Sequence, residues 1–319
     1  MSDKSGQFKK PEFYDGLVLY FHPYSYYSQK VLLALHEKQI EFTPYVIDVS
    51  NGEQFASWFL NLNPKGEVPV LQDGCFIIPD SAHIIGYLEN KYSKGKQRRL
   101  IPTDTSSKEF QKIRFYQRTL KRIPIGAISL GSFIHEDLNL NPKPPFIGPI
   151  RKTCLETNEK VNRILKTCAN QNDVNSGSLF KKVEFQEKRR EIISDRVAYQ
   201  KLLDALETVL RYIENDLKNN SREKWLCSDE LSIADITLGL MLHRLYSLGF
   251  EDYFWTNGKM PYLENYFQNF KSRESFQKSV PTTMSIWKDI LRKVPSNYKF
   301  GAGVLGMALF AATALAHRV

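Results

Sequence analysis

Cysteine and histidine have the widest redox and metal chemistry of the side chains, so their spacing is considered first. The cysteines stand far apart without a CxxC pair, which argues against a dithiol motif, and the histidines show no metal-ligand spacing. Residues 1–10 are polar and contain no apolar signal-peptide core. We therefore expect reduced thiols and no metal. The residues are Cys75, Cys154, Cys168, Cys227, His22, His36, His83, His135, His243 and His317.

Three glycines near the C-terminus, Gly301, Gly303 and Gly306, spell GxGxxG. This spacing binds a dinucleotide only when it follows a strand and opens the helix of a βαβ unit. Neither condition is met here, so we expect no dinucleotide cofactor. The small residues are suited instead to close helix packing in a membrane.

A serine and an aspartate, Ser232 and Asp235, are spaced as a capping box before an apolar run. Their hydroxyl and carboxylate satisfy the free amides of a helix start. We expect them to play a structural role at the head of a buried helix that continues to Leu248.

The run of residues 300–316, from Phe300 to Ala316, carries one polar side chain, Thr313, and no charge. As a helix it would span about 25 Å, enough for a thin bilayer. It is apolar on every face, which suits a transmembrane tail anchor better than a terminal helix packed on the protein.

Basic residues precede this run, at Lys288, Arg292, Lys293 and Lys299, and only His317 and Arg318 follow it. This asymmetry predicts that the bulk of the protein faces the cytosol. The formal charge of +9 also fits an anionic membrane surface. Because the basic residues are spread along the chain without a nucleic-acid-binding motif, we expect no nucleic-acid partner.

The composition, 42% hydrophobic and 25% charged, indicates globular domains before the tail. Residues 1–14 are expected to be flexible, and residues 15–93 follow the order strand, helix, strand, helix, hairpin, helix. This order is the thioredoxin-like α/β arrangement. The expected strands are residues 17–21, 41–49, 68–71 and 75–78, and the expected helices are residues 28–38, 53–60 and 82–92.

Residues 94–104 form a predicted linker to a second, all-helical domain at residues 105–284. A proline-rich break at residues 141–149 opens a charged insertion at about 141–200. Residues 285–299 then form a basic juxtamembrane segment. The expected helices are residues 105–121, 125–138, 151–168 and the charged run 179–217, followed by the helix after the capping box.

A thioredoxin-like domain followed by a helical domain with Ser-x-x-Asp at its central helix resembles the cytosolic glutathione transferases. The resemblance covers nearly all of the chain before the tail. Its most specific part is GEVPVL, residues 66–71, where that family carries a cis-proline after the residue whose backbone pairs with glutathione. Pro69 and Val68 take those two positions.

The resemblance also implies that Asp80 and Ser81 bind the γ-glutamyl carboxylate at a helix start. Asp80 is shorter than the Glu or Gln usual in the family. Ser81 could also serve only as a helix cap, and the two roles are compatible.

Catalysis in the family uses a hydroxyl or thiol near the start of the first helix, where it lowers the thiol pKa of glutathione. Ser25 aligns best with the serine of the zeta-like enzymes, and Tyr26, Tyr27 and Ser28 are alternatives. No cysteine is present there, which argues against omega-type thiol reductases. Cys75 is expected to be a packed residue.

The SQKV helix start, the charged insertion and the apolar tail together resemble an invertebrate-like form of the ganglioside-induced differentiation-associated protein family. That resemblance implies a homodimer in the mitochondrial outer membrane, with peroxisomes as a second address. It implies a role in mitochondrial fission, network dynamics and redox homeostasis. Glutathione conjugation is then weak or absent, no resident cofactor is expected, and glutathione is a candidate ligand or substrate.

Two hypotheses follow. In the first, the protein is a membrane-tethered regulator that binds protein partners through residues 181–196, which begin with Lys181 and end with Arg196. The alternative is an active, membrane-tethered glutathione transferase in which Ser25 stabilises the thiolate.

Overall fold

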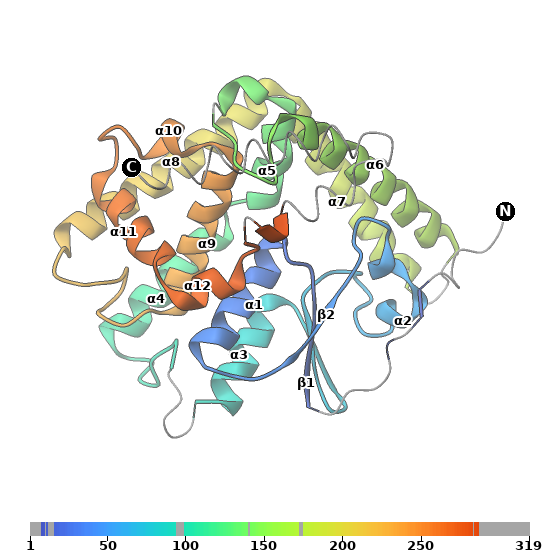
Figure 1. Cartoon of the computed structure of the whole chain (residues 1–319), viewed down its shortest axis with the longest axis horizontal. Coiled ribbons are helices and arrows are strands. Elements are labelled where there is room, and N and C mark those ends of the chain that lie inside the picture. Colours follow the sequence, from blue (N-terminus) through green and yellow to red (C-terminus); the bar gives the residue numbers. More distant parts are fainter. Residues whose placement is uncertain are drawn as a thin grey trace.

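The computed structural model describes residues 8–9, 11, 16–93, 99–139, 141–171, 175–282 and 284–286. A sheet-containing half joins a larger helical half (Figure 1). The predicted tail at residues 300–316 and most of the basic segment at residues 285–299 lie outside the described residues. Among the described helices, none is long and apolar enough to cross a membrane.

The N-terminal half is a four-stranded sheet in the order β2-β1-β3-β4. Strand β1 pairs in parallel with β2 and antiparallel with β3, which pairs antiparallel with β4. The elements are β1 (Leu17–Phe21), α1 (Tyr26–Glu37), β2 (Thr43–Val46), the 3-10 turn η2 (Glu53–Phe55), α2 (Ser57–Leu60), β3 (Val70–Asp73), β4 (Phe76–Pro79) and α3 (Ser81–Lys91). This is the predicted thioredoxin-like arrangement.

Strand β1 is buried along its whole length because both faces of the sheet are covered. Alternate side chains point to opposite faces. Val18 and Tyr20 pack with Trp58 and Phe59 of the α2 segment. The intervening residues, such as Leu19, join the large core that continues through α1 and α3 into the helical half.

The C-terminal half is all-helical, as predicted. The charged run expected at residues 179–217 is two helices and not one, because Asp195 ends α7 and its carboxylate accepts the amide hydrogen of Ala198 at the start of α8 (2.9 Å). The elements are α4 (Lys108–Lys121), α5 (Ile125–Ile134), η3 (Glu136–Leu138), α6 (Gly148–Gln171), α7 (Ser176–Ser194), α8 (Arg196–Asn219), α9 (Ile233–Leu248), α10 (Glu251–Phe254), α11 (Pro261–Lys271) and α12 (Glu274–Ser279).

The predicted capping box begins α9, the central and almost wholly buried helix. The fully buried carboxylate of Asp235 accepts hydrogen bonds from the amides of Ser232 and Leu226, both at 2.8 Å. It also accepts from the hydroxyls of Ser232 (2.7 Å) and Tyr266 (2.9 Å). These four bonds satisfy a group whose pKa is raised by burial, so Asp235 has the structural role that its spacing predicts.

Helix α1 lies between the sheet and helices α9 and α12 of the other half (Figure 1). Its last turn leads to Lys38, which is buried and donates to Glu89 of α3 at 2.9 Å. The Glu89 carboxylate also accepts the amide hydrogen of Leu100 at 3.2 Å, where the chain enters the helical half. A buried ion pair thus lies at the junction of the two halves.

The substitution Lys38→Met tests this junction. It leaves the Glu89 carboxylate buried without its cation, and we expect it to destabilise the protein by about 3–5 kcal/mol. The double variant Lys38→Met/Glu89→Gln should recover at least about 1 kcal/mol of this, because the neutral amide needs no counterion. Urea unfolding of the full chain followed by circular dichroism measures both.

The matched control is Lys188→Met, which removes an exposed lysine paired with Glu184 within α7. Its unfolding midpoint should equal that of the wild type. A loss as small for Lys38→Met as for this control would contradict the assigned role of the buried pair.

Candidate functional site

The sheet brings the three predicted site segments together at one end of its strands. Tyr20 near the end of β1 pairs with Val70 at the start of β3, and Val70 pairs with Pro79 at the end of β4. At this end of the sheet, β1 leads into the start of α1, the loop that contains Val68 and Pro69 leads into β3, and β4 leads into the start of α3. Residues 25–28, 68–69 and 80–81 are thus gathered although they are far apart in sequence.

The loop before β3 has the expected cis peptide bond between Val68 and Pro69. Gly66 precedes it with a positive φ of 56°. A β-carbon at Gly66 would lie 2.7 Å from the ring of Phe55, so only glycine fits there. The loop thus has the cis bond that the resemblance implies, and peptide binding by the Val68 backbone stays a prediction.

Helix α3 is capped by Asp80 and not by Ser81, the alternative considered from the sequence. The Asp80 carboxylate accepts from the amides of Ala82 (2.8 Å) and His83 (3.3 Å), and Ser81 is the buried first residue of the helix. Asp80 has a φ of +71°, a strained value for a residue other than glycine. Its short side chain is turned back on its own helix, so Ser81 and the remaining helix amides are what could face an anionic ligand.

The four candidate hydroxyls at the start of α1 have different environments. Tyr26 is buried and donates to the backbone carbonyl of Thr237 in α9 at 3.1 Å, so it forms a contact between the two halves. Ser28 is buried and accepts the amide hydrogen of His22 at 3.3 Å. Tyr27 is 51% exposed. Ser25 is the N-cap, and its Oγ accepts the amide hydrogen of Ser28 at 3.3 Å.

In this arrangement the hydroxyl of Ser25 can donate a hydrogen bond to a ligand. Its Oγ uses a lone pair for the cap, so its O–H remains available to donate to a bound anion. A thiolate placed there would meet a hydroxyl donor and the positive end of the α1 dipole, and both lower a thiol pKa. Burial raises the pKa of Tyr26, which makes it a poor source of negative charge. The residues of the described part contain no cluster of ligands that could hold a metal ion.

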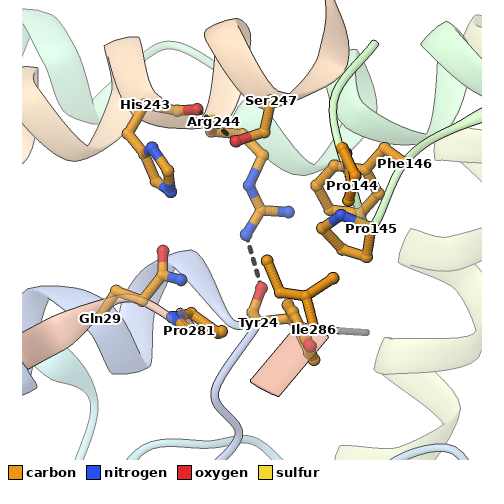
Figure 2. Close-up of a pocket in the computed structure, with 10 residues that line it drawn as sticks. All are labelled: Tyr24, Gln29, Pro144, Pro145, Phe146, His243, Arg244, Ser247, Pro281 and Ile286. Carbon is orange, nitrogen blue, oxygen red and sulfur yellow. Dashed lines mark hydrogen bonds between the residues drawn. The ribbon is translucent and has the colours of Figure 1, made fainter. Parts of the chain in front are cut away.

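A small cavity lies beside this site, between the β1–α1 loop, α9 and the segment before α6 (Figure 2). Its volume of about 40 Å³ has room for a few water molecules. Arg244 projects into it and donates to the carbonyl of Tyr24 at 2.5 Å, with its guanidinium 5.3 Å from the ring centre of Phe146. Next to Phe146 the Pro144–Pro145 peptide bond is cis.

Two titratable groups of α9 line this cavity. Burial lowers the pKa of His243 to about 3, and Arg244 and Lys271 add repulsion. Burial also lowers the pKa of Arg244 to about 10. The Nδ1 atom of His243 is buried without a hydrogen-bond partner in the described part of the chain. Sequence reasoning missed both residues, although a His-Arg pair inside an otherwise apolar helix was the available signal.

Comparison with known proteins identifies the class to which this fold and site belong. The family model for the N-terminal domain of glutathione S-transferase matches residues 24–91, and the model for the C-terminal domain matches residues 183–274. The chain belongs to the glutathione transferase-like superfamily. The predicted fold class is therefore confirmed for both domains, whereas the tail remains a prediction.

Individual relatives define the similarity more finely. The chain is 28% identical over 319 aligned residues to human ganglioside-induced differentiation-associated protein 1-like 1, covering 93% of this chain and 86% of that protein. It is 26% identical to glutathione S-transferase TCHQD of Arabidopsis thaliana, covering 85% and 91%. The predicted resemblance to the ganglioside-induced differentiation-associated protein family is thus confirmed.

Solved structures share the fold at lower sequence identity. The β-etherase LigF from Sphingobium sp. strain SYK-6 superposes with a TM-score of 0.61 at 20% identity, covering 83% of this chain and 98% of that one. Poplar glutathione transferase F1 gives 0.56 at 22% identity, covering 83% and 97%. The part of the chain that these structures match therefore has the same fold.

The neutral state of His243 predicts how stability depends on pH. The pKa of His243 is about 3 in the folded protein and 6.5 in the unfolded chain. Between these two pH values the unfolded chain binds a proton that the folded protein does not bind. Stability is then lost as the pH falls below 6.5, by up to about 1.4 kcal/mol per unit from this residue. His243→Phe should flatten that slope in urea unfolding between pH 7.5 and 4.5. The exposed His83→Gln should keep it, and equal slopes in all three proteins would refute the assignment.

Proposed function

We propose that this protein is a tail-anchored, glutathione transferase-like protein of the mitochondrial outer membrane, with its bulk in the cytosol. It would act on mitochondrial fission, network dynamics and redox homeostasis, with weak or absent transferase activity. The observation that carries the proposal is the uncharged, apolar run at residues 300–316 placed after a transferase body whose last described element is α12. The match over 93% of the chain to a ganglioside-induced differentiation-associated protein supports the same assignment.

Several features of the site support a binding role over efficient catalysis. The carboxylate of Asp80 is engaged by its own helix. Tyr26 is engaged by α9, and Tyr27 projects from the start of α1 with half of its surface exposed. The Ser25 hydroxyl accepts the cap hydrogen bond and can still donate its O–H, as the chemistry requires. A regulator that senses a glutathione-like ligand needs the peptide-binding backbone at Val68 and Ser81 but not rapid turnover.

The alternative is an active, membrane-tethered glutathione transferase. The free donor of Ser25 at the N-terminus of α1 and the cis Val68–Pro69 bond favour it. Both proposals place the same residues around the ligand, so turnover separates them.

Protein partners and a homodimer belong to the proposal as well. Helix α7 presents an outer face with exposed charged residues and Phe185, whose side chain is 64% exposed. A partner that binds residues 181–196 would use this outer face, since Leu179 and Ile193 of the same helix are buried against the fold.

A fluorescent fusion to residues 289–319 tests the membrane assignment. We expect it to label mitochondria, because the apolar run and its basic flank suffice for post-translational insertion. Replacing Ala311 and Ala312 by Arg is the control, since two charges at mid-span oppose insertion and should release the fusion. A diffuse signal from the unmodified fusion would refute the membrane anchor. A purely peroxisomal signal would assign the protein to the peroxisomal membrane instead.

Isothermal titration of the full chain in mild detergent with glutathione tests the ligand assignment. We expect binding in the millimolar range and conjugation of a standard electrophile close to the uncatalysed rate. Ser25→Ala should lower any residual turnover about tenfold or more while leaving binding unchanged, because the hydroxyl acts on the thiolate. Turnover of many cycles per second would establish the alternative, and no heat at 10 mM glutathione would remove glutathione as the ligand.

A further inference from the structure

Helix α4 has an exposed face on which every charged side chain is basic. Its opposite side buries Ile113, Tyr116 and Leu120 in the core. The exposed cations recur at spacings of three, four and seven residues, which places them on one side of the helix. Glu109, the one acid in the sequence of α4, is half-buried and accepts the hydroxyl hydrogen of Ser228 at 2.8 Å. The basic face consists of Lys108, Arg114, Arg118, Lys121 and the C-cap residue Arg122.

Acidic side chains near α4 do not neutralise the basic face. Asp216 at the end of α8 and Glu223 after it both pair with Lys112 at 3.2 Å, and Lys112 is not part of that face. Glu207 of α8 pairs with Arg211 of its own helix at 2.6 Å. Among the residues that the structure describes, no ion pair includes a cation of the basic face. Its positive charge is therefore available to an anionic partner.

Two aromatic rings are exposed beside these cations. Phe115 of α4 is 46% exposed and Tyr212 of α8 is 52% exposed, and their ring centres are 5.7 Å apart. Phe115 directly follows Arg114 and lies less than one turn before Arg118, so its ring is on the same side as the cations. Aromatic rings combined with basic side chains are typical of surfaces that lie at the interface between lipid and water. This combination favours a lipid surface over a purely ionic partner.

The predicted anchor would keep the body close to a bilayer. The last described residue is Ile286, and the predicted transmembrane run begins at Phe300. Residues 287–299 can span at most about 45 Å, even when fully extended. A contact between the tethered body and the bilayer is then intramolecular, with an effective concentration on the order of millimolar. A modest attraction is enough to populate such a contact.

We propose that the basic face of α4, together with Phe115 and Tyr212, binds the anionic lipid surface of the membrane that holds the tail. The cations attract the acidic head groups, and the rings enter the head-group region. This inference rests on the proposed membrane anchor and goes beyond it by naming the face of the body that meets the bilayer. The anchor limits the distance of the body from the membrane, whereas α4 sets its orientation.

A tryptophan in place of Phe115 reports contact with lipid directly. The full chain is inserted through its tail into vesicles of phosphatidylserine and a phosphatidylcholine that is brominated near the head group and quenches tryptophan on contact. We expect the added fluorescence of Phe115→Trp, relative to the wild type, to be quenched at least about twofold, because the attraction holds the ring among the head groups. In vesicles without phosphatidylserine this quenching should disappear.

Phe185→Trp is the matched control for position. Phe185 is 64% exposed on α7, which lies on the opposite side of the molecule from α4 (Figure 1). Its added fluorescence should be the same with and without the brominated lipid. Equal quenching of the two variants, or no quenching of Phe115→Trp, would overturn the proposal.

The charge dependence is measured without insertion, on the full chain carrying Ala311→Arg and Ala312→Arg. We expect Arg114→Gln/Arg118→Gln/Lys121→Gln to weaken its binding to phosphatidylserine vesicles at least about tenfold, because each of these cations contributes to the attraction. Raising the salt concentration should weaken binding of the parent chain in the same way, because salt screens exposed charges. Co-sedimentation with the vesicles measures both effects.

Lys181→Gln/Lys188→Gln/Arg190→Gln is the matched control for charge, since it removes the same number of exposed cations from α7. It should weaken vesicle binding much less than the α4 variant does. Equal losses would overturn the proposal, because net charge and not α4 would then determine binding. Binding of a single-stranded RNA through the basic face, by a chain that ignores the vesicles, would assign the face to nucleic acid and overturn the proposal too.

Failure of the two proposals can be distinguished. If the membrane anchor is wrong, a high-salt wash removes the wild type from zwitterionic vesicles, while the basic face still binds phosphatidylserine vesicles at low salt. If the basic face is wrong, the wild type stays anchored through the wash and Phe115→Trp is not quenched. Thermal melts of each variant confirm that the fold is retained before these comparisons are made.

Discussion

The backbone of Leu100 hydrogen-bonds to both halves of this protein where the chain passes from one to the other. Its N–H donates to the carboxylate of Glu89 at 3.2 Å, and its carbonyl accepts the amide hydrogen of Ile233 at 3.1 Å. Glu89 is itself held by Lys38, and Ile233 follows the capping box of Asp235. Because a buried carboxylate without partners is costly, each of these contacts depends on the others. This chain of contacts joins the sheet half to the start of α9.

Helix α1 transmits that constraint to the site. Its C-terminal end is held by Lys38 and by Glu37, whose carboxylate accepts two hydrogen bonds from Arg273 at 2.8 Å. Its N-terminal end is held by Tyr26 through the carbonyl of Thr237. With both ends fixed to the helical half, the Ser25 hydroxyl has little freedom to move relative to Val68 and Ser81. Such preorganisation serves ligand binding and catalysis alike.

The charged side chains of α7, in the insertion, lie on two different faces of the helix. Helix α7 reads in sequence as a uniformly charged segment. In the fold, Lys182 contacts the loop before Pro69 and Arg189 lies against α5, while Lys181, Lys188 and Arg190 remain on the outer face. The same helix therefore has an exposed charged face and a face that packs on the loop before the cis Val68–Pro69 bond.

Features set by neighbouring residues were predictable from the sequence alone. Strand β1 has the predicted bounds, and the capping box of Ser232 and Asp235 forms at its predicted place, because strand periodicity and helix caps depend on local spacing. The cis-proline could be expected only through the family resemblance. The basic, apolar tail remains a prediction from sequence, since residues 300–316 lie outside the described part.

Tertiary structure decided which side chains can act. Four hydroxyls at the start of α1 were candidates, with Ser25 aligned best, and packing against α9 engages Tyr26 while the Ser25 hydroxyl can still donate. Packing also brings Lys182 to the carboxylate of Glu67, which lies 115 residues away in the sequence. The physical reason is that burial and charge proximity depend on contacts between distant segments, whereas caps and periodicity depend on residues within one or two turns.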